Sequence, residues 1–201
     1  INVYSNWIDT DLFKPITNTK KYDNRILAIG KLEKQKNYPL IFNAIEDSSF
    51  TLDIIGSGEM EEELRELAIK LKINVNFLGS FKNDQLPTKY NQYPIYVLTS
   101  IAEGNPKTLL EAMACECAVI GTNVAGINNI VRDGKNGILV EPENPEELSN
   151  AIIKLLDNPS LRDNLGSAGY DFVQKECNCI SMAKNHLKLY QNILDNIQNK
   201  Y

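Results

Sequence analysis

The sequence predicts an α/β fold, a doubly wound parallel six-stranded sheet with extra C-terminal helices. Two observations support this prediction. The chain contains six short apolar runs that are continuous rather than alternating, as is typical of parallel strands buried on both faces. Helical patterns lie between these runs, and only helical patterns follow residue 145. The same alternation is typical of a Rossmann-like sheet.

The apolar runs define the expected strands. Each run is bounded by polar residues or turn-forming residues, which is typical of strands in an α/β sheet. In chain order they are RILAIG (25–30), TLDIIG (51–56), VNFLG (75–79), IYVLTS (95–100), AVIGT (118–122) and GILV (137–140).

Helical patterns are clear in three segments. EMEEELRELAIKLK (59–72) places its leucines on one face, and it begins with glutamate and ends with lysine, which suits the helix dipole. NPEELSNAIIKLLDN (144–158) begins with Asn144 as the expected N-cap and Pro145 at the first helical position. An amphipathic helix is expected around residues 182–197 at the end of the chain.

Composition excludes several classes of function. With 201 residues and 43% hydrophobic content, the chain can build one sizeable domain. The net charge of −5 argues against nucleic acid as a partner. The longest apolar runs are far shorter than the roughly 20 residues of a membrane span, and no N-terminal segment combines a basic start, an apolar stretch and a small-residue cleavage site. We therefore expect a cytoplasmic protein with reduced cysteines at Cys115, Cys117, Cys177 and Cys179.

A binding site is expected at the carboxyl ends of the strands, where open α/β sheets hold their ligands. Glycines recur in these loops and permit the backbone to approach a ligand closely. The loops are Gly30-Lys31, GSG (56–58), LGSF (78–81), SIAEGNP (100–106) and TNVAG (122–126).

The loop after the fourth expected strand is the most informative. Asn105 can cap and Pro106 can begin a helix from about residue 107 to 114, whose first N–H groups, at Lys107 and Thr108, suit a phosphate. Glu103 precedes this helix and Glu111 lies within it, and carboxylates can accept hydrogen bonds from paired sugar hydroxyls. The alternative is that Glu103 is a solvated loop residue and Glu111 a helix-surface residue.

Two lysines follow the first strand. Lys31 and Lys36 could both point into the crevice and neutralise a diphosphate. The alternative is that KLEKQK is a solvated turn.

Two other features resemble functional sites but are interpreted differently. Asp9-Thr10-Asp11 has the D-x-D spacing of a metal-binding motif, yet it lies outside the strand–helix pattern, so no metal site is predicted. His186 is the only histidine and lies one helical turn before Tyr190, which favours a surface or packing role.

Taken in order, these segments resemble the nucleotide-sugar-binding half of glycosyltransferase family 4, retaining enzymes with the two-domain GT-B fold. NWIDTDLFKP is similar to N-G-V-D-x-x-x-F-x-P, and GKLEKQKNYPLIFNAI is similar to G-R-L-x-x-x-K-G-x-x-x-L-I-x-A. Glu103 and Glu111 match the E-x₇-E signature, followed by EAMACECAVIGTNVAG and NNIVRDGKNGILVEPENPEEL. E-x₇-E alone is a weak signal, but the ordered set is specific and covers nearly the whole chain.

The resemblance implies a role for each matching residue. Glu111 would hold the ribose hydroxyls, Glu103 would face the donor sugar, and backbone N–H groups after Gly104 would hold the β-phosphate. Lys36 matches a diphosphate-binding lysine, and Lys31 stands where arginine is usual. The implied catalytic residues are Glu103, Lys36 and Lys31. The implied donor-binding residues are Gly30, Lys31, Lys36, Gly56, Gly79, Ser80, Phe81, Glu103, Gly104, Asn105, Lys107, Thr108 and Glu111.

Four positions depart from the family pattern. Glu116 and Ala118 stand where glycine and proline are usual, Ala125 replaces the first of two glycines, and Asn129 replaces a glutamate. Glu116 is expected to place a charged side chain in a tight helix-to-strand turn.

The resemblance also implies an organisation and a reaction. Residues 1–15 would be an interdomain connector, 16–180 the nucleotide-sugar-binding domain, and 181–201 a helix packing toward an absent N-terminal domain. Because INVYSNWIDTDLFKP begins without methionine, we expect a piece of a larger protein, inactive by itself. That protein would transfer a hexosyl group from a UDP- or GDP-sugar, without a metal or cofactor, to a glycan or lipid-linked acceptor bound through the N-terminal domain. It would serve bacterial surface polysaccharide biosynthesis, with peripheral contact at the inner face of the membrane.

Two alternatives stay open from the sequence. A sugar-nucleotide 2-epimerase shares the two-domain architecture, although the E-x₇-E signature followed by EAMA argues against it. A non-catalytic binding or interaction module is the other, because Glu116, Ala125 and Asn129 depart from the family pattern.

Overall fold

A computed structural model describes residues 6–198 of the chain, without the side chains of 185, 192, 193 and 195–198. Its centre is one six-stranded sheet in the order β3-β2-β1-β4-β5-β6, and every pairing is parallel. The strands are β1 (Arg25–Ile29), β2 (Thr51–Ile55), β3 (Asn74–Phe77), β4 (Ile95–Leu98), β5 (Ala118–Thr122) and β6 (Ile138–Val140). The predicted fold class and all six predicted strands are confirmed.

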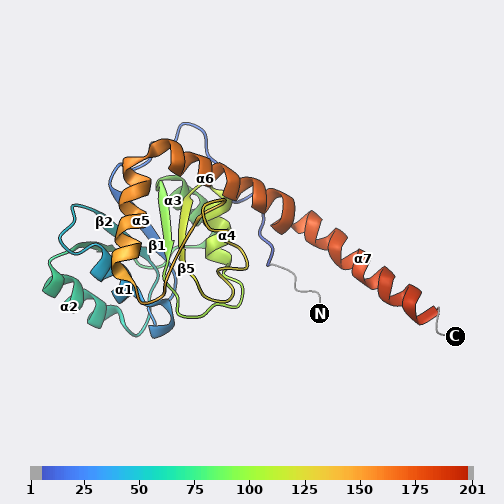
Figure 1. The fold of residues 1–201 in the computed structure, drawn as a ribbon, viewed down its shortest axis with the longest axis horizontal. Coiled ribbons are helices and arrows are strands. Elements are labelled where there is room, and N and C mark those ends of the chain that lie inside the picture. The colour runs from blue at the N-terminus through green and yellow to red at the C-terminus, as the bar shows by residue number, and fades with distance from the viewer. Residues whose placement is uncertain (1–5, 199–201) are drawn as a thin grey trace.

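Helices connect the strands, except between β5 and β6, and cover both faces of the sheet (Figure 1). The short helices are η1 (Lys34–Lys36), α1 (Tyr38–Ala44), η2 (Asn83–Gln85), α3 (Leu86–Asn91) and α4 (Lys107–Ala114). The longer ones are α2 (Glu61–Leu71), α5 (Pro145–Asp157), α6 (Pro159–Phe172) and α7 (Cys179–Gln198), with the π-helical segment η3 (Val173–Cys177) before α7. The predicted N-cap of α5 is confirmed, since Asn144 Oδ1 accepts from Glu147 N at 3.0 Å.

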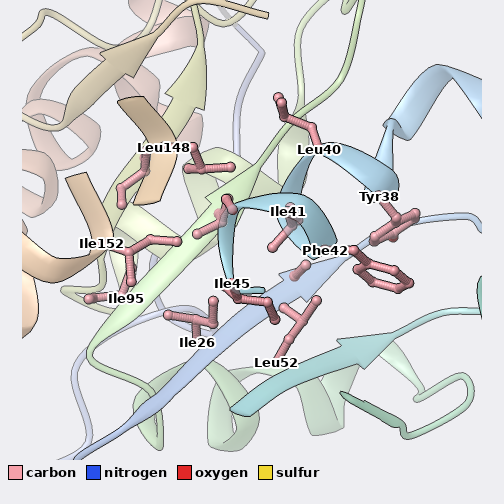
Figure 2. Close-up of a cluster of buried hydrophobic side chains, with 14 of the residues drawn as sticks. Ile26, Tyr38, Leu40, Ile41, Phe42, Ile45, Leu52, Ile95, Leu148 and Ile152 are labelled. Atoms are coloured by element: carbon pink, nitrogen blue, oxygen red, sulfur yellow. The ribbon is translucent and has the colours of Figure 1, made fainter. Parts of the chain in front are cut away.

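The continuous apolar runs have a direct structural cause, because every strand except the edge strand β3 contributes to two hydrophobic clusters. In β3 the side chains alternate, with Asn74 and Asn76 exposed. On one face, side chains from α1, α5 and the strands converge, as Figure 2 shows for Ile41, Ile45, Ile152, Ile26 and Leu52. The alternate strand positions point to the opposite face, where they pack against α3 and α4. Both faces are therefore covered, and the open edge for a ligand is the one formed by the strand ends.

The described part of the segment before β1, residues 6–24, packs against the domain. Ile8 and Phe13 are buried, and Ile8 N donates to Cys177 O at 3.0 Å. Helix α7 begins two residues after Cys177 and extends away from the sheet (Figure 1), with Leu187 and Leu194 exposed. No helix among residues 6–198 is long and apolar enough to cross a membrane. The boundaries expected at residues 15 and 180 stay predictions, and residues 1–5 and 199–201 lie outside the described part.

The backbone of the turn between α4 and β5 explains why glycine would suit the position of Glu116. Glu116 has a φ of 56°, in the left-handed region that residues with a Cβ seldom adopt. Helix α6 packs closely on this turn, since a Cβ on Gly166 would lie 2.7 Å from Glu116 O. The expectation of a tight turn at Glu116 is confirmed.

Replacing Glu116 with glycine is expected to raise the free energy of unfolding by about 1 kcal/mol, because glycine adopts this φ without a Cβ clash. Chemical denaturation measures the change. Glu116→Ala is the matched control, since alanine removes the charge but keeps the Cβ. An equal gain in the alanine variant would contradict the backbone explanation.

Candidate functional site

The first three strands end side by side in glycine-containing loops. Gly56 has a φ of 148°, and a Cβ there would lie 1.9 Å from Gly30 O, so only glycine permits this approach of the two loops. Gly56 N donates to Gly79 O at 2.9 Å. No described atom lies within 4 Å of the position of a Cβ on Gly79, which leaves this side of the loop open. The structure thus brings Gly30, Gly56 and Gly79 to one edge.

An ion pair joins the loops after β1 and β4. Lys36 Nζ lies 2.5 Å from Glu103 Oε1, and the side chains are only 17% and 9% exposed. Ser100 Oγ donates to the same Glu103 oxygen at 2.6 Å. One carboxylate oxygen is therefore held by a cation and a hydroxyl, which fixes the orientation of the carboxyl group. Glu103 is not the solvated loop residue of the alternative interpretation.

Backbone contacts hold these two loops in register. Thr99 Oγ1 donates to Lys36 O at 2.9 Å, and Ile101 N donates to Gln35 O at 2.9 Å. Gln35 Nε2 donates to Ala102 O at 2.8 Å. The 3₁₀ turn η1 therefore presents Lys36 toward the loop that carries the glutamate.

Lys31 is not brought into this cluster. Its side chain is 68% exposed, and Nζ pairs with Glu33 Oε2 at 3.1 Å. The interaction with Glu33 raises the pKa of Lys31. Of the two lysines expected to face a diphosphate, the structure positions Lys36 and leaves Lys31 at the surface.

Glu111 is buried, which excludes the helix-surface alternative. It is 7% exposed, and Oε2 accepts from Tyr90 Oη at 3.0 Å. Burial raises the pKa of the Glu111 carboxyl, while the Tyr90 hydrogen bond and the Lys107 charge oppose this rise. A partly desolvated carboxylate with one remaining oxygen can accept strong hydrogen bonds from a ligand.

This raised pKa predicts a pH-dependent stability. Because the folded protein binds the Glu111 proton more tightly than the unfolded chain, stability falls as the pH rises from 4.5 through the raised pKa, and the loss is constant above it. Glu111→Gln should therefore raise Tm by a few degrees at neutral pH and leave it unchanged well below pH 4.5. Thermal melts across pH test this expectation.

The matched control for that experiment is Glu66→Gln, which changes an exposed carboxylate of α2. We expect its Tm to follow the wild type at every pH. A Glu111→Gln variant that is less stable than the wild type at neutral pH would contradict the desolvation of Glu111.

The amino end of α4 lies between the two glutamates. The first N–H groups of this helix, beginning at Lys107 and Thr108, have no earlier turn of helix to bond to. A Cβ on Gly126 would lie 2.2 Å from Glu103 O, so the loop after β5 packs closely against the loop that carries Glu103. No described atom lies within 4 Å of a Cβ position on Gly104, which leaves room for a ligand.

The prediction that Asn105 caps α4 is wrong. Pro106 occupies the N-cap position in an extended conformation, and no side chain caps the helix. Asn105 is one residue too early, and its Oδ1 is buried without a hydrogen-bond partner among the described residues. Its backbone carbonyl accepts from Asn6 Nδ2 at 3.3 Å.

The loop after β3 lies beside the loop after β2. Ser80 Oγ and Ser57 Oγ are 3.1 Å apart, and Ser80 is exposed. Phe81 is half-buried, with Lys89 Nζ 4.7 Å from its ring centroid. The segment from Gly79 to Phe81 thus lies at the same edge of the sheet, where β3 is three strand positions away from β4.

Three residues of this site were not predicted. Ser100 holds Glu103, Tyr90 holds Glu111, and Tyr96 Oη donates to Thr108 Oγ1 at 2.8 Å. Ser100 had a signal, because it follows an apolar strand in the expected ligand loop. Tyr90 and Tyr96 had none, since their contacts join elements that the sequence does not pair.

The two features interpreted as non-functional have structural explanations. Asp9 Oδ1 accepts from Asp11 N and Leu12 N at 2.9 and 3.1 Å, so Asp9 stabilises a turn. His186 stacks on Tyr190 with ring centroids 6.4 Å apart. Among the side chains that the structure describes, no group of three acidic, cysteine or histidine residues could hold a metal.

Comparison with known sequences identifies relatives of the chain. Residues 9–172 match the family described as glycosyl transferases group 1. An uncharacterized glycosyltransferase of Methanocaldococcus jannaschii is 33% identical over 150 residues, which cover 74% of this chain and 43% of the relative. UDP-Gal:alpha-D-GlcNAc-diphosphoundecaprenol alpha-1,3-galactosyltransferase of Escherichia coli is 30% identical over 184 residues, covering 80% and 46%. The chain spans about half the length of the curated relatives it matches.

Solved structures share the fold. The C-terminal domain of a glycosyl transferase group 1 family protein (LpcC) from Francisella tularensis superposes with a TM-score of 0.75 at 25% identity, covering 86% of this chain and 99% of that one. The Anabaena protein HepE in complex with UDP-glucose superposes with a TM-score of 0.84 at 20% identity, covering 95% and 57%.

Proposed function

The chain belongs to the glycosyl transferases group 1 family, and we propose that it is the nucleotide-sugar-binding half of a retaining family 4 enzyme. This enzyme transfers a hexosyl group from a UDP- or GDP-sugar to a glycan or lipid-linked acceptor. The observation that carries the proposal is the Lys36–Glu103 ion pair at 2.5 Å, which lies between glycine-containing loops and next to the amino end of α4.

In this proposal the donor lies across the strand ends. Glu111 accepts from the ribose hydroxyls, and the loop from Gly79 to Phe81 borders the base. The first N–H groups of α4 and Lys36 neutralise the diphosphate, while Glu103 accepts from the hydroxyls of the transferred sugar. Lys31 is exposed, so its contribution requires the side chain to leave Glu33. The UDP-Gal in the name of the Escherichia coli relative and the UDP-glucose bound to HepE support a UDP-sugar donor.

The proposed reaction breaks the bond between the anomeric carbon and the diphosphate oxygen and forms one to the acceptor hydroxyl oxygen, on the same face of the sugar. The acceptor proton passes to the departing diphosphate, so no protein nucleophile is needed. Charge develops on the diphosphate as the bond breaks, and Lys36 with the α4 N–H groups stabilises that charge.

The acceptor is proposed to bind to a part of the protein outside this chain. Two observations support this: the chain spans 43% of the first relative, and the Escherichia coli relative is named for a diphosphoundecaprenol acceptor. A lipid-linked acceptor implies peripheral contact of the whole protein with a membrane and a role in surface polysaccharide biosynthesis.

Calorimetry of the chain with UDP and GDP tests the proposal. We expect one of the two nucleotides to bind, and the Glu111→Gln variant to bind it about 10- to 100-fold more weakly, because a charged hydrogen-bond acceptor is lost. If neither nucleotide binds at millimolar concentration, the non-catalytic interpretation is favoured. Release of a free 2-epimer from a nucleotide sugar by the whole protein would favour the epimerase.

A further inference from the structure

The only tryptophan of the chain lies beside the candidate site with much of its ring exposed. Trp7 is 47% exposed, and Lys107 Nζ lies 4.9 Å from its ring centroid. Asn6 connects the same segment to the site, because its Nδ2 donates to Asn105 O and its Oδ1 accepts from Trp7 N. The segment before the first strand thus meets the loop that carries Glu103.

An indole in this position has a specific use. Tryptophan is highly buried on average, and its ring combines an apolar face with a polar N–H, so an exposed tryptophan beside polar groups offers a stacking surface. Lys107 contacts the ring and also lowers the pKa of Glu111, so the same cation lies near both Trp7 and a candidate donor-binding residue.

Asn105 adds a polar group to this corner. Its Oδ1 is buried and has no partner within the described residues, although such atoms are normally bonded. Rotation of this amide toward a ligand hydroxyl would break no hydrogen bond of Oδ1, and it would relieve an unsatisfied group.

We propose that Trp7, with Lys107 and Asn105, forms a subsite for a pyranose ring at the mouth of the nucleotide-sugar site. The apolar C–H face of the sugar stacks on the indole, and its hydroxyls bond to Lys107 and Asn105. The inference rests on the proposed function. Both a donor sugar and an acceptor sugar have a pyranose ring that can stack on Trp7, and the experiment below distinguishes them.

The arrangement of the sheet favours a sugar over the nucleobase. Trp7 contacts α4, which follows β4, whereas the loop proposed for the base follows β3. In the order β3-β2-β1-β4 these strands are three spacings apart, roughly 14 Å. A base bordered by that loop is therefore too far from Trp7 to stack on it, and the sugar end of the donor lies on the Trp7 side.

Ligand binding at Trp7 can be followed by tryptophan fluorescence, because the chain has one tryptophan and the emission therefore reports on that position. The chain is titrated with UDP, UDP-glucose, UDP-N-acetylglucosamine, GDP and GDP-mannose, and then with methyl glucoside and methyl N-acetylglucosaminide in the presence of UDP. A donor sugar on Trp7 changes the emission with a nucleotide sugar but not with the nucleotide. An acceptor sugar changes it only with a glycoside.

Calorimetry of variants completes the test. Trp7→Ala should lower the affinity for the sugar ligand that changes the emission, by about 5- to 10-fold, and leave the affinity for the nucleotide unchanged. Trp7→Phe should restore part of the lost affinity. Tyr190→Ala, which removes an exposed aromatic ring of α7, should change neither affinity.

Three results would overturn the subsite. They are unchanged sugar affinity in Trp7→Ala, equal loss of nucleotide and nucleotide-sugar affinity in that variant, and no change of Trp7 emission with any nucleotide sugar or glycoside. If the wild type binds neither nucleotide nor any nucleotide sugar, the proposed function fails as well. Nucleotide binding without a Trp7 effect removes only the subsite.

Discussion

Under the proposed function, replacing Lys36 with methionine should lower the rate of sugar transfer by the whole protein about 10²- to 10³-fold, because the departing diphosphate loses a fixed positive charge. In this chain the same substitution should lower the affinity for UDP or GDP by about 10- to 100-fold. Methionine keeps much of the length of the side chain, so the loss reports mainly on charge. Steady-state kinetics of the whole protein and calorimetry of the chain measure the two effects.

Two matched controls surround this position. Lys34 is an exposed lysine of the same 3₁₀ turn, and Lys34→Met should leave binding unchanged. Lys31 is 68% exposed and paired with Glu33, so Lys31→Met should have a smaller effect than Lys36→Met. Equal losses in the Lys31 and Lys36 variants would show that both lysines reach the diphosphate, as the sequence alone suggested.

A double variant separates binding from stability. Lys36→Met leaves Glu103 as an unpaired and mostly buried charge, which destabilises the fold by itself. Adding Glu103→Gln removes that charge and should recover Tm without recovering nucleotide affinity. Recovery of the affinity together with Tm would mean that Lys36 acts only by supporting the fold.

The parts of the structure that could be predicted are those that depend on local patterns. Continuous apolar runs predicted all six strands, and the Asn144-Pro145 pair predicted the start of α5. After the similar Asn105-Pro106 pair, α4 begins at Lys107 as expected, but Pro106 rather than Asn105 occupies the N-cap position because the chain stays extended through Pro106. Which of two neighbouring residues ends up as the cap depends on the loop that leads into the helix.

The parts that could not be predicted depend on contacts between distant segments. The sequence alone does not distinguish Lys31 from Lys36, because both are lysines in the polar segment after β1. The contacts of η1 with the loop after β4 turn Lys36 toward Glu103. The hydroxyl of Tyr90 reaches Glu111 from α3, a helix of six residues with little amphipathic pattern of its own. A buried carboxylate indicates that partners must exist, but the sequence does not name them.

Asp53 is the second position with a large expected effect, this time on stability. It lies in the middle of β2 with no exposed surface, and it accepts hydrogen bonds from three neighbouring groups. Arg25 and Tyr93 Oη donate to Oδ2 at 2.9 and 2.6 Å, and Asn76 Nδ2 donates to Oδ1 at 2.6 Å. The network joins β1, β2 and β3 to the segment before β4.

Asp53→Ala is expected to lower the free energy of unfolding by about 3–5 kcal/mol, because it leaves a cation, a hydroxyl and an amide without their acceptor. Such a loss is a large part of the roughly 5–15 kcal/mol that holds a domain folded. Urea denaturation measures it. The matched control is Glu61→Ala, which breaks an exposed Glu61–Arg65 pair of 2.7 Å and should lower stability by at most about 0.5 kcal/mol. A similar small loss in both variants would show that the Asp53 network is no stronger than a surface ion pair.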